Sequence, residues 1–204
     1  MRMLLLFGIM CFGFNIYAQE LPIKNNRGGL FSLGMRSTLS TFNGHHNESN
    51  GFGVGGQFRL QFADQVNSDW FFDYIQSDVG DYATRTDYHI GWSVLYYPWK
   101  SVNKVQPYVL AGHCFDRTFM AENGNRSNNI ARWSSAAQAG LGVHFNLTDR
   151  FDISLVSQYM LHLGNEVGAH EHDGHVHFHD EEKSSMEGHL LFHVGLNYKI
   201  ADLW

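Results

Sequence analysis

Apolar and polar residues alternate along most of this chain, and polar, glycine-containing links separate the alternating segments. In the segment 29–42, Phe31, Leu33 and Leu39 fall on one face, while small residues and Arg36 fall on the other. A period of two indicates a β-strand with two different faces. The same pattern predicts strands at 52–63, 69–78, 88–97, 133–147, 151–163 and 188–200. A further strand, at 106–118, is apolar on both faces, so its two sides stay unassigned.

These eight strands predict an all-β fold, an eight-stranded antiparallel up-and-down transmembrane β-barrel. Each strand is long enough to cross a bilayer when tilted, and beyond the N-terminal region no apolar stretch is long enough for a spanning helix. One face is rich in Phe, Leu, Trp and Tyr, whereas the other holds glycine, serine and a few charges. A soluble barrel of the lipocalin kind would place its apolar face inside. We therefore expect the apolar face to contact lipid.

The polar face of the predicted strands carries two arginines and two aspartates. An eight-stranded barrel is only wide enough to be filled by its own side chains, which excludes an open porin. Because an unpaired charge inside would be destabilising, we expect Arg36 and Arg59 to pair with Asp73 and Asp152 in a polar plug. We interpret these four residues as a structural network in the lumen.

The N-terminus has the layout of a secretory signal peptide, with Arg2, an apolar run and Ala18 at the expected cleavage site. We assign 1–18 to this peptide, 19–28 to a periplasmic lead and 29–204 to the barrel. Cleavage leaves Cys114 as the single cysteine, so no intramolecular disulfide is expected. It removes one of the 14 basic residues and none of the 20 acidic ones, and an acidic mature chain argues against a nucleic-acid partner.

The links between the predicted strands alternate between short and long. The links at 64–68, 99–105 and 148–150 are short, whereas those at 43–51, 79–87, 119–132 and 164–187 are longer. Outer-membrane barrels have short periplasmic turns and long external loops. The sequence therefore predicts a monomer in the outer membrane of a Gram-negative bacterium, with lipid around it and the loop 164–187 on the extracellular side.

This last and longest loop contains the tract 170–182, in which five histidines and five acidic residues occupy thirteen positions. Imidazole nitrogen binds zinc, copper and nickel, and carboxylates add oxygen ligands and a potential that attracts cations. Closure of the barrel would bring the loop 43–51 close to the tract. The predicted metal ligands are His45, His46, His162, His170, His172, Asp173, His175, His177, His179, Asp180, Glu181 and His189.

Gly168, Gly174 and a low apolar content predict that this loop is mobile, with moderate affinity for divalent transition metals and little selectivity among them. Such binding would suit metal scavenging, assisted uptake or resistance better than catalysis. The alternative is a structural or adhesive envelope barrel whose solvated acidic loop binds metal only incidentally.

The chain resembles, over nearly all of the segment after residue 18, the small outer-membrane barrels of the OmpA/OmpX type. The phrases "QPYVLAG" and "GLGVHFNLTDRFDISLVSQY" are similar to strands five to seven of that family. His193, Gly195, Tyr198 and Ile200 resemble its C-terminal signal, and Trp204 adds a terminal aromatic residue. The resemblance implies that the barrel-assembly machinery recognises the last strand.

The stretch "SQYMLHLGNEVG" resembles, more loosely, the active-site strand of the lipid A deacylases, where a histidine, a serine and an asparagine act together. His162 and Asn165 match that pattern. Gly164 stands where the serine is needed, and acyl transfer by that route requires the hydroxyl. We therefore expect no enzymatic activity, and a lipid A-modifying enzyme stays a minor alternative.

Overall fold

A computed structural model describes residues 28–204 except 43–48, 100–103, 165, 173–174 and 182–187. The predicted signal peptide, and the lead as far as residue 27, lie outside the described residues. The strands are β1 (Leu30–Phe42), β2 (Gly51–Ala63), β3 (Val66–Val79), β4 (Ala83–Tyr96), β5 (Val105–Glu122), β6 (Asn125–Asn146), β7 (Phe151–Leu163), β8 (Glu166–His172), β9 (His175–Glu181) and β10 (Gly188–Asp202).

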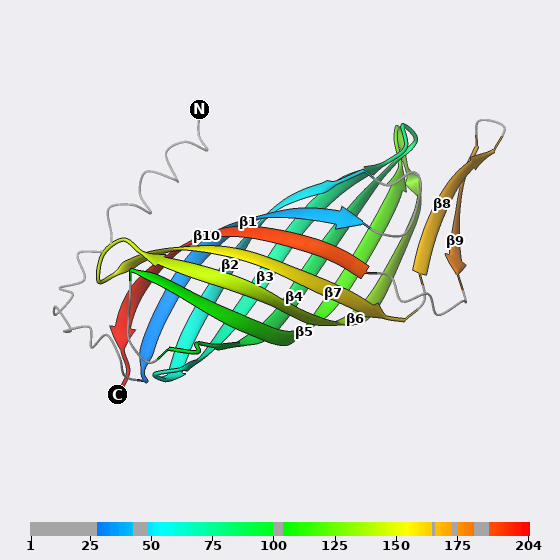
Figure 1. The fold of residues 1–204 in the computed structure, drawn as a ribbon. Coiled ribbons are helices and arrows are strands. Elements are labelled where there is room, and N and C mark those ends of the chain that lie inside the picture. The colour runs from blue at the N-terminus through cyan, green and yellow to red at the C-terminus, as the bar shows by residue number, and fades with distance from the viewer. Residues whose placement is uncertain (1–27, 43–48, 100–103, 165, 173–174, 182–187) are drawn as a thin grey trace, which may run out of the picture.

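Eight of these strands form one closed antiparallel barrel in the order β1-β10-β7-β6-β5-β4-β3-β2, as Figure 1 shows. From β1 to β7, strands that are adjacent in the barrel are consecutive in the chain. After β7 the chain forms a separate two-stranded sheet, β8 and β9, and then returns to the barrel as β10, which lies between β7 and β1. Strand β1 pairs with β2 on one side and with β10 on the other, from Leu30↔Asp202 to Phe42↔His189. The predicted fold, an eight-stranded antiparallel all-β barrel, is confirmed.

The outer surface of the barrel wall is apolar over a broad band. Met35 and Leu141 are 76% and 65% exposed, and outward side chains on the other strands are also exposed. Their neighbours along each strand, such as Ser32, Arg36 and Asn197, are buried in the lumen. This arrangement is the reverse of a soluble protein and is typical of a barrel surrounded by lipid. Among the described residues, no helix is long and apolar enough to span a membrane.

The structure shows which side of β5 faces the lumen, a question that the sequence left open. Val109 and Phe115 face outward, whereas Leu110 and Cys114 are buried inside. The strand is apolar on both faces because the lumen contains an apolar layer, formed by Phe71, Ile75, Cys114, Ala136, Met160 and Leu191. Gly91 makes room for this layer, since a Cβ there would lie 2.6 Å from the Phe71 ring. The interior is therefore layered and is not the uniformly polar plug that we expected.

The charged residues of the lumen form ion pairs. Arg36 donates from Nε to Asp73 Oδ1 at 2.6 Å and from Nη2 to Asp73 Oδ2. Arg59 Nη1 lies 3.4 Å from Asp152 Oδ1, which also accepts a hydrogen bond from Asn197 Nδ2 at 2.9 Å. These pairs join the four residues that the sequence assigned to a lumen network. Each of these four charges has a partner in an interior that water cannot freely solvate.

Strands β3, β4, β5 and β6 extend together beyond β7 at one end, so that the links predicted to be long at 79–87 and 119–132 are short turns at 80–82 and 123–124. The pairing of β6 with β7 ends at Ser135↔Leu163, whereas the pairing of β5 with β6 continues to Glu122↔Asn125. The hairpin of β8 and β9 stands at this same end, opposite the C-terminus (Figure 1). The sequence predicted a loop at 164–187, and the structure differs because most of that segment forms paired strands.

Replacing a lipid-facing side chain by a charge should destabilise the barrel according to its depth in the membrane. We expect Val194→Arg, near the middle of β10, to lower the free energy of unfolding by about 2–4 kcal/mol, and Ile200→Arg, near the strand end, by about 0–1 kcal/mol. Equilibrium unfolding in urea, with the protein folded into lipid vesicles, would measure both. Equal losses for the two variants would contradict the proposed position of the apolar band.

Removing one member of the Arg36–Asp73 pair should lower the free energy of unfolding more than removing both. Asp73→Ala leaves a buried guanidinium without its carboxylate, and we expect it to lower the free energy of unfolding by about 3–5 kcal/mol. The double variant Arg36→Met with Asp73→Ala should recover part of that loss in the same assay. Asp64→Ala, in an exposed turn, serves as the control. A stability of Asp73→Ala equal to that of the wild type would show that the pair does not matter.

Candidate functional site

The histidine tract folds into an antiparallel hairpin. Strands β8 and β9 pair in the register His170↔His177, His172↔His175 and Gly168↔His179. Residues that are directly opposite in an antiparallel pair project on the same face, and so do residues two apart in one strand. All five histidines of the hairpin therefore lie on a single face, which we call the histidine face: His170, His172, His175, His177 and His179.

The imidazole rings on the histidine face lie close to one another. The His170 ring centroid is 5.7 Å from that of His177 and 5.1 Å from that of His179. The residue opposite His179 is Gly168, where a Cβ would lie 2.7 Å from the His179 ring, so a glycine there lets this ring pack over the neighbouring strand. The side chains of His170, His172, His175 and His177 are exposed.

The opposite face of the hairpin is apolar and packs against the barrel end. Val167 and Val176 are buried, at 4% and 8% exposure, and Phe178 is half-buried. Tyr82 donates a hydrogen bond from its hydroxyl to the Ala169 carbonyl at 3.1 Å. Asn128 donates from Nδ2 to the Val176 carbonyl at 2.8 Å. The hairpin is thus attached through its backbone and its apolar face, which leaves the histidine face open to solvent.

The other predicted ligands are distributed differently. His45, His46 and Asp173 lie outside the described residues, and Asp180 and Glu181 belong to β9 but their side chains are not described. Across the described part of the chain, no group of three or more His, Cys, Asp or Glu side chains is already arranged to hold a metal ion. The histidine face is therefore a surface of neighbouring ligands and not a preformed metal centre.

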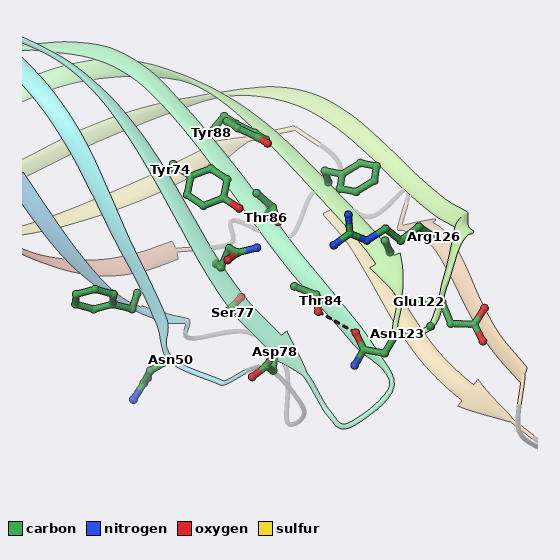
Figure 2. A pocket seen from close by; sticks show the side chains of 15 residues that line it. Asn50, Tyr74, Ser77, Asp78, Thr84, Thr86, Tyr88, Glu122, Asn123 and Arg126 are labelled. Atoms are coloured by element: carbon green, nitrogen blue, oxygen red, sulfur yellow. Dashed lines mark hydrogen bonds between the residues drawn. The ribbon is translucent and has the colours of Figure 1, made fainter. Parts of the chain in front are cut away.

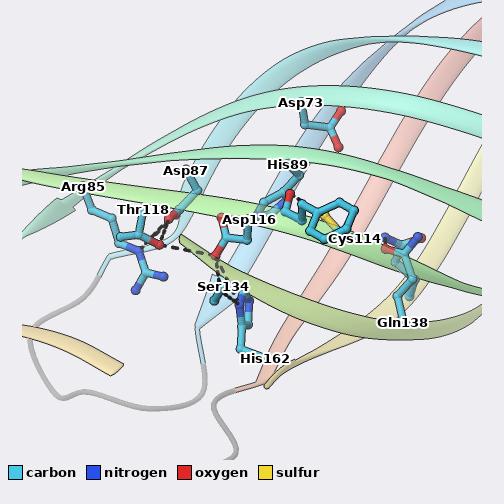
Figure 3. Close-up of polar contacts among 12 residues, drawn as sticks. Asp73, Arg85, Asp87, His89, Cys114, Asp116, Thr118, Ser134, Gln138 and His162 are labelled. Carbon is cyan, nitrogen blue, oxygen red and sulfur yellow. Dashed lines mark hydrogen bonds and ion pairs between the residues drawn. The ribbon is translucent and has the colours of Figure 1, made fainter. Parts of the chain in front are cut away.

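His162 and His189 belong to a second cluster, which is buried in the lumen. Asp116 Oδ2 lies 3.2 Å from Nδ1 of His162, and Asp116 Oδ1 lies 3.5 Å from Nε2 of His89 (Figure 3). The rings of His162 and His189 are 4.5 Å apart, and both residues are almost fully buried. His162 and His189, two of the predicted metal ligands, therefore lie in the lumen and not on the histidine face. We call this set of four residues the lumen histidine cluster.

Asp116 is the member of this cluster that sequence reasoning missed. It lies on β5, whose inward and outward sides could not be assigned from the alternation. Thr118 Oγ1 donates to it at 3.3 Å and also to Asp87 Oδ1 at 2.8 Å, and Asp87 accepts from Arg85 Nε at 3.0 Å (Figure 3). Asp116 thereby connects the histidines to the ion pair of Arg85 and Asp87.

The arrangement around His162 does not match a nucleophile and base. Ser134 Oγ lies 3.4 Å from Nδ1 of His162, and Asp116 approaches the same nitrogen. In a serine–histidine–aspartate relay the serine and the acid contact different ring nitrogens. Gly164, at the position where the resemblance to deacylases needs a serine, directly follows β7 and has a φ of 154°. The minor alternative of a lipid A-modifying enzyme gains no support from these contacts.

Solved structures of small outer-membrane proteins are similar to this barrel. Neisserial surface protein A aligns over 83% of this chain and 96% of its own, with a TM-score of 0.63 and 15% identity. The outer membrane protein OprG from Pseudomonas aeruginosa aligns over 87% of this chain and 98% of its own, with a TM-score of 0.56 and 16% identity. Ail, the attachment invasion locus protein of Yersinia pestis, aligns over 85% of this chain and 98% of its own, with a TM-score of 0.51 and 14% identity.

No protein-family model matches the sequence, and no curated protein is significantly similar to it. At identities of 14–16% the structural similarity establishes the fold and leaves the function open. The closed order of strands, the apolar outer band and the filled lumen agree with that similarity. The chain therefore has the fold of the small bacterial outer-membrane β-barrel proteins.

Proposed function

We propose that this outer-membrane barrel captures transition-metal ions, zinc, copper or nickel, on the histidine face of the β8–β9 hairpin. The observation that carries the proposal is the register of the hairpin, which places five imidazoles on one face, four of them exposed. Histidines scattered over a mobile loop would have to be ordered on binding, whereas these are already held by a paired backbone. Metal scavenging, assisted uptake or resistance are the roles that such a surface would serve.

Ring spacing supports shared coordination. An imidazole nitrogen binds zinc at about 2.0–2.1 Å, which puts the ion roughly 3 Å from the ring centre and limits two ligand rings on one ion to a separation of about 6 Å. The centroid distances of 5.7 Å for His170–His177 and 5.1 Å for His170–His179 fall within that limit. Rotation of exposed side chains can then direct their nitrogens to one ion, with water as a further ligand.

Two properties of the barrel favour an extracellular position for the hairpin. The hairpin lies at the end where β3 to β6 extend beyond β7. This end also carries the longest connection between barrel strands, 164–187, although its turns at 80–82 and 123–124 are as short as the links 64–65 and 147–150 at the opposite end. Outer-membrane barrels place short turns in the periplasm and longer connections outside. The histidine face would then meet metal ions in the surrounding medium before they reach the membrane.

Binding to the histidine face should be moderate in affinity and poorly selective. The ligands come from a surface that offers no enclosed cavity of fixed geometry, and selectivity among these metals depends on such geometry. Affinity should therefore follow the usual order, with copper bound more tightly than nickel or zinc.

The second candidate is an adhesive or structural envelope barrel, with incidental metal binding. It is favoured by the projection of β3 to β6 beyond β7, with exposed polar residues such as Asn125 and Ser127 at the tip of β5 and β6. Ail, which has a similar barrel, is an attachment protein by its name. Binding of the protein to surfaces in the absence of metal would favour this second candidate.

Removing the ring cluster should weaken metal binding without unfolding the hairpin. We expect the triple variant His170→Asn, His177→Asn and His179→Asn to bind zinc and copper about tenfold more weakly or worse, because three of the five ligands are lost. Isothermal titration of the full mature chain in detergent would measure this. His113→Asn, on the lipid-facing side of β5, is the control. An unchanged affinity in the triple variant would exclude the histidine face as the site.

Metal binding should be lost on acidification. A histidine must be neutral to bind a metal, so protons compete with the metal for its nitrogen on acidification. We expect zinc to dissociate when the medium is made acidic and to rebind when the pH is restored, as measured by a fluorescent zinc indicator. Retention of zinc at pH 5 would point to carboxylate ligands in place of the histidines.

A further inference from the structure

The histidine face can supply only part of the ligand shell of a metal ion. The rings of His170 and His177 lie on the same side of a two-stranded sheet, with centroids 5.7 Å apart. Zinc in a structural site takes four ligands at the corners of a tetrahedron. When two corners are occupied by rings from one face, the other two corners point away from the sheet. A single hairpin therefore leaves half of such a shell open.

The third neighbouring ring does not close this shell. His179 lies 5.1 Å from His170, but it belongs to the same face, is partly buried and packs over Gly168. It therefore approaches an ion from the side of the sheet, as the rings of His170 and His177 do. The ligands for the outward corners come from water or from another molecule.

The hairpin is fixed to the barrel through both of its strands. Asn128 donates from Nδ2 to the Val176 carbonyl on β9 at 2.8 Å and to Oε2 of Glu122 at 2.9 Å. Glu122, the last residue of β5, is drawn in Figure 2. On β8 the Ala169 carbonyl accepts the hydrogen bond from the Tyr82 hydroxyl. These attachments leave the histidine face free to meet another molecule and hold it in place when it does.

The charges near the histidine face do not oppose the approach of a second one. The ionisable side chains that the structure describes on this face are histidines, and a histidine that binds metal is neutral. Glu171 is paired with Val176 and so belongs to the opposite face. The groove drawn in Figure 2, near the same end of the barrel, has Asp78, Glu122 and Arg126 but no histidine in its lining. It therefore offers no competing imidazole ligands.

We propose that a zinc ion joins two copies of this chain, with His170 and His177 of each copy as its ligands. This inference rests on the proposed metal binding and adds the partner. In a two-fold arrangement one surface faces its own copy, so an ion on the axis receives the same two ligands from each chain. Two rings from each face occupy all four corners and displace water. Zinc accommodates such a tetrahedral shell, whereas copper(II) favours a planar one.

The test is the mass of the full mature chain in detergent, measured by analytical ultracentrifugation as zinc is added. We expect a monomer without zinc, a dimer that holds one zinc per two chains, and a monomer again when EDTA removes the metal. The double variant His170→Asn with His177→Asn should dimerise at least about tenfold more weakly. The control, His113→Asn with Glu171→Gln, removes two side chains outside the histidine face and should dimerise normally. Equal dimerisation by the wild type and the His170/His177 variant overturns the proposal.

Zinc titration of the same wild-type samples separates this inference from the proposed function. A chain that binds zinc and stays monomeric overturns the zinc bridge and leaves the metal-binding surface intact, whereas a chain that binds no zinc overturns both. Cobalt(II) in place of zinc gives a second measurement on the wild type. A tetrahedral shell of four imidazoles gives cobalt(II) an intense visible absorption, while a six-coordinate shell that includes water is pale. A pale cobalt complex overturns the shell of four histidines.

Discussion

The pairing of β1 with β10 is the contact on which the rest of this molecule depends. In a bilayer no water is available for unpaired backbone groups, so a sheet can cross it only when the first and last strands meet. Here they are hydrogen-bonded from Leu30↔Asp202 to Phe42↔His189, along the whole length of β1. That closure fixes which face of every strand is inside. It also brings together, in one narrow lumen, residues that are far apart in the chain, such as Arg36 and Asp73 or His89 and His162.

The filled lumen explains why the candidate functions lie on the surface. Ion pairs occupy one part of the interior, an apolar layer around Phe71 and Met160 another, and the lumen histidine cluster a third. Such a barrel has no wide aqueous path along its axis. Molecules larger than water can therefore bind at the hairpin and on the outer wall, where side chains contact lipid or the medium.

Alternation along the chain was sufficient to predict the barrel and the direction of most side chains. The outward positions of Trp70, Leu196 and Tyr198 and the inward positions of Asp73 and Asn197 are those that the period of two indicates. The method failed on β5, because an apolar layer inside the lumen makes both faces of that strand apolar, and Asp116 was overlooked for the same reason. The hairpin was missed because glycines and many charges concealed the short apolar alternation of Val167, Ala169, Val176 and Phe178.

The attachment of the hairpin has a consequence for how this protein can change. Tyr82 and Asn128 hold the backbone carbonyls of Ala169 and Val176, and the apolar face packs against the barrel. The histidines of the hairpin take no part in either hydrogen bond, so most of them can be replaced without breaking these two attachments to the barrel. Evolution or protein engineering can therefore change the side chains of the histidine face, while the contacts that attach the hairpin to the barrel stay the same.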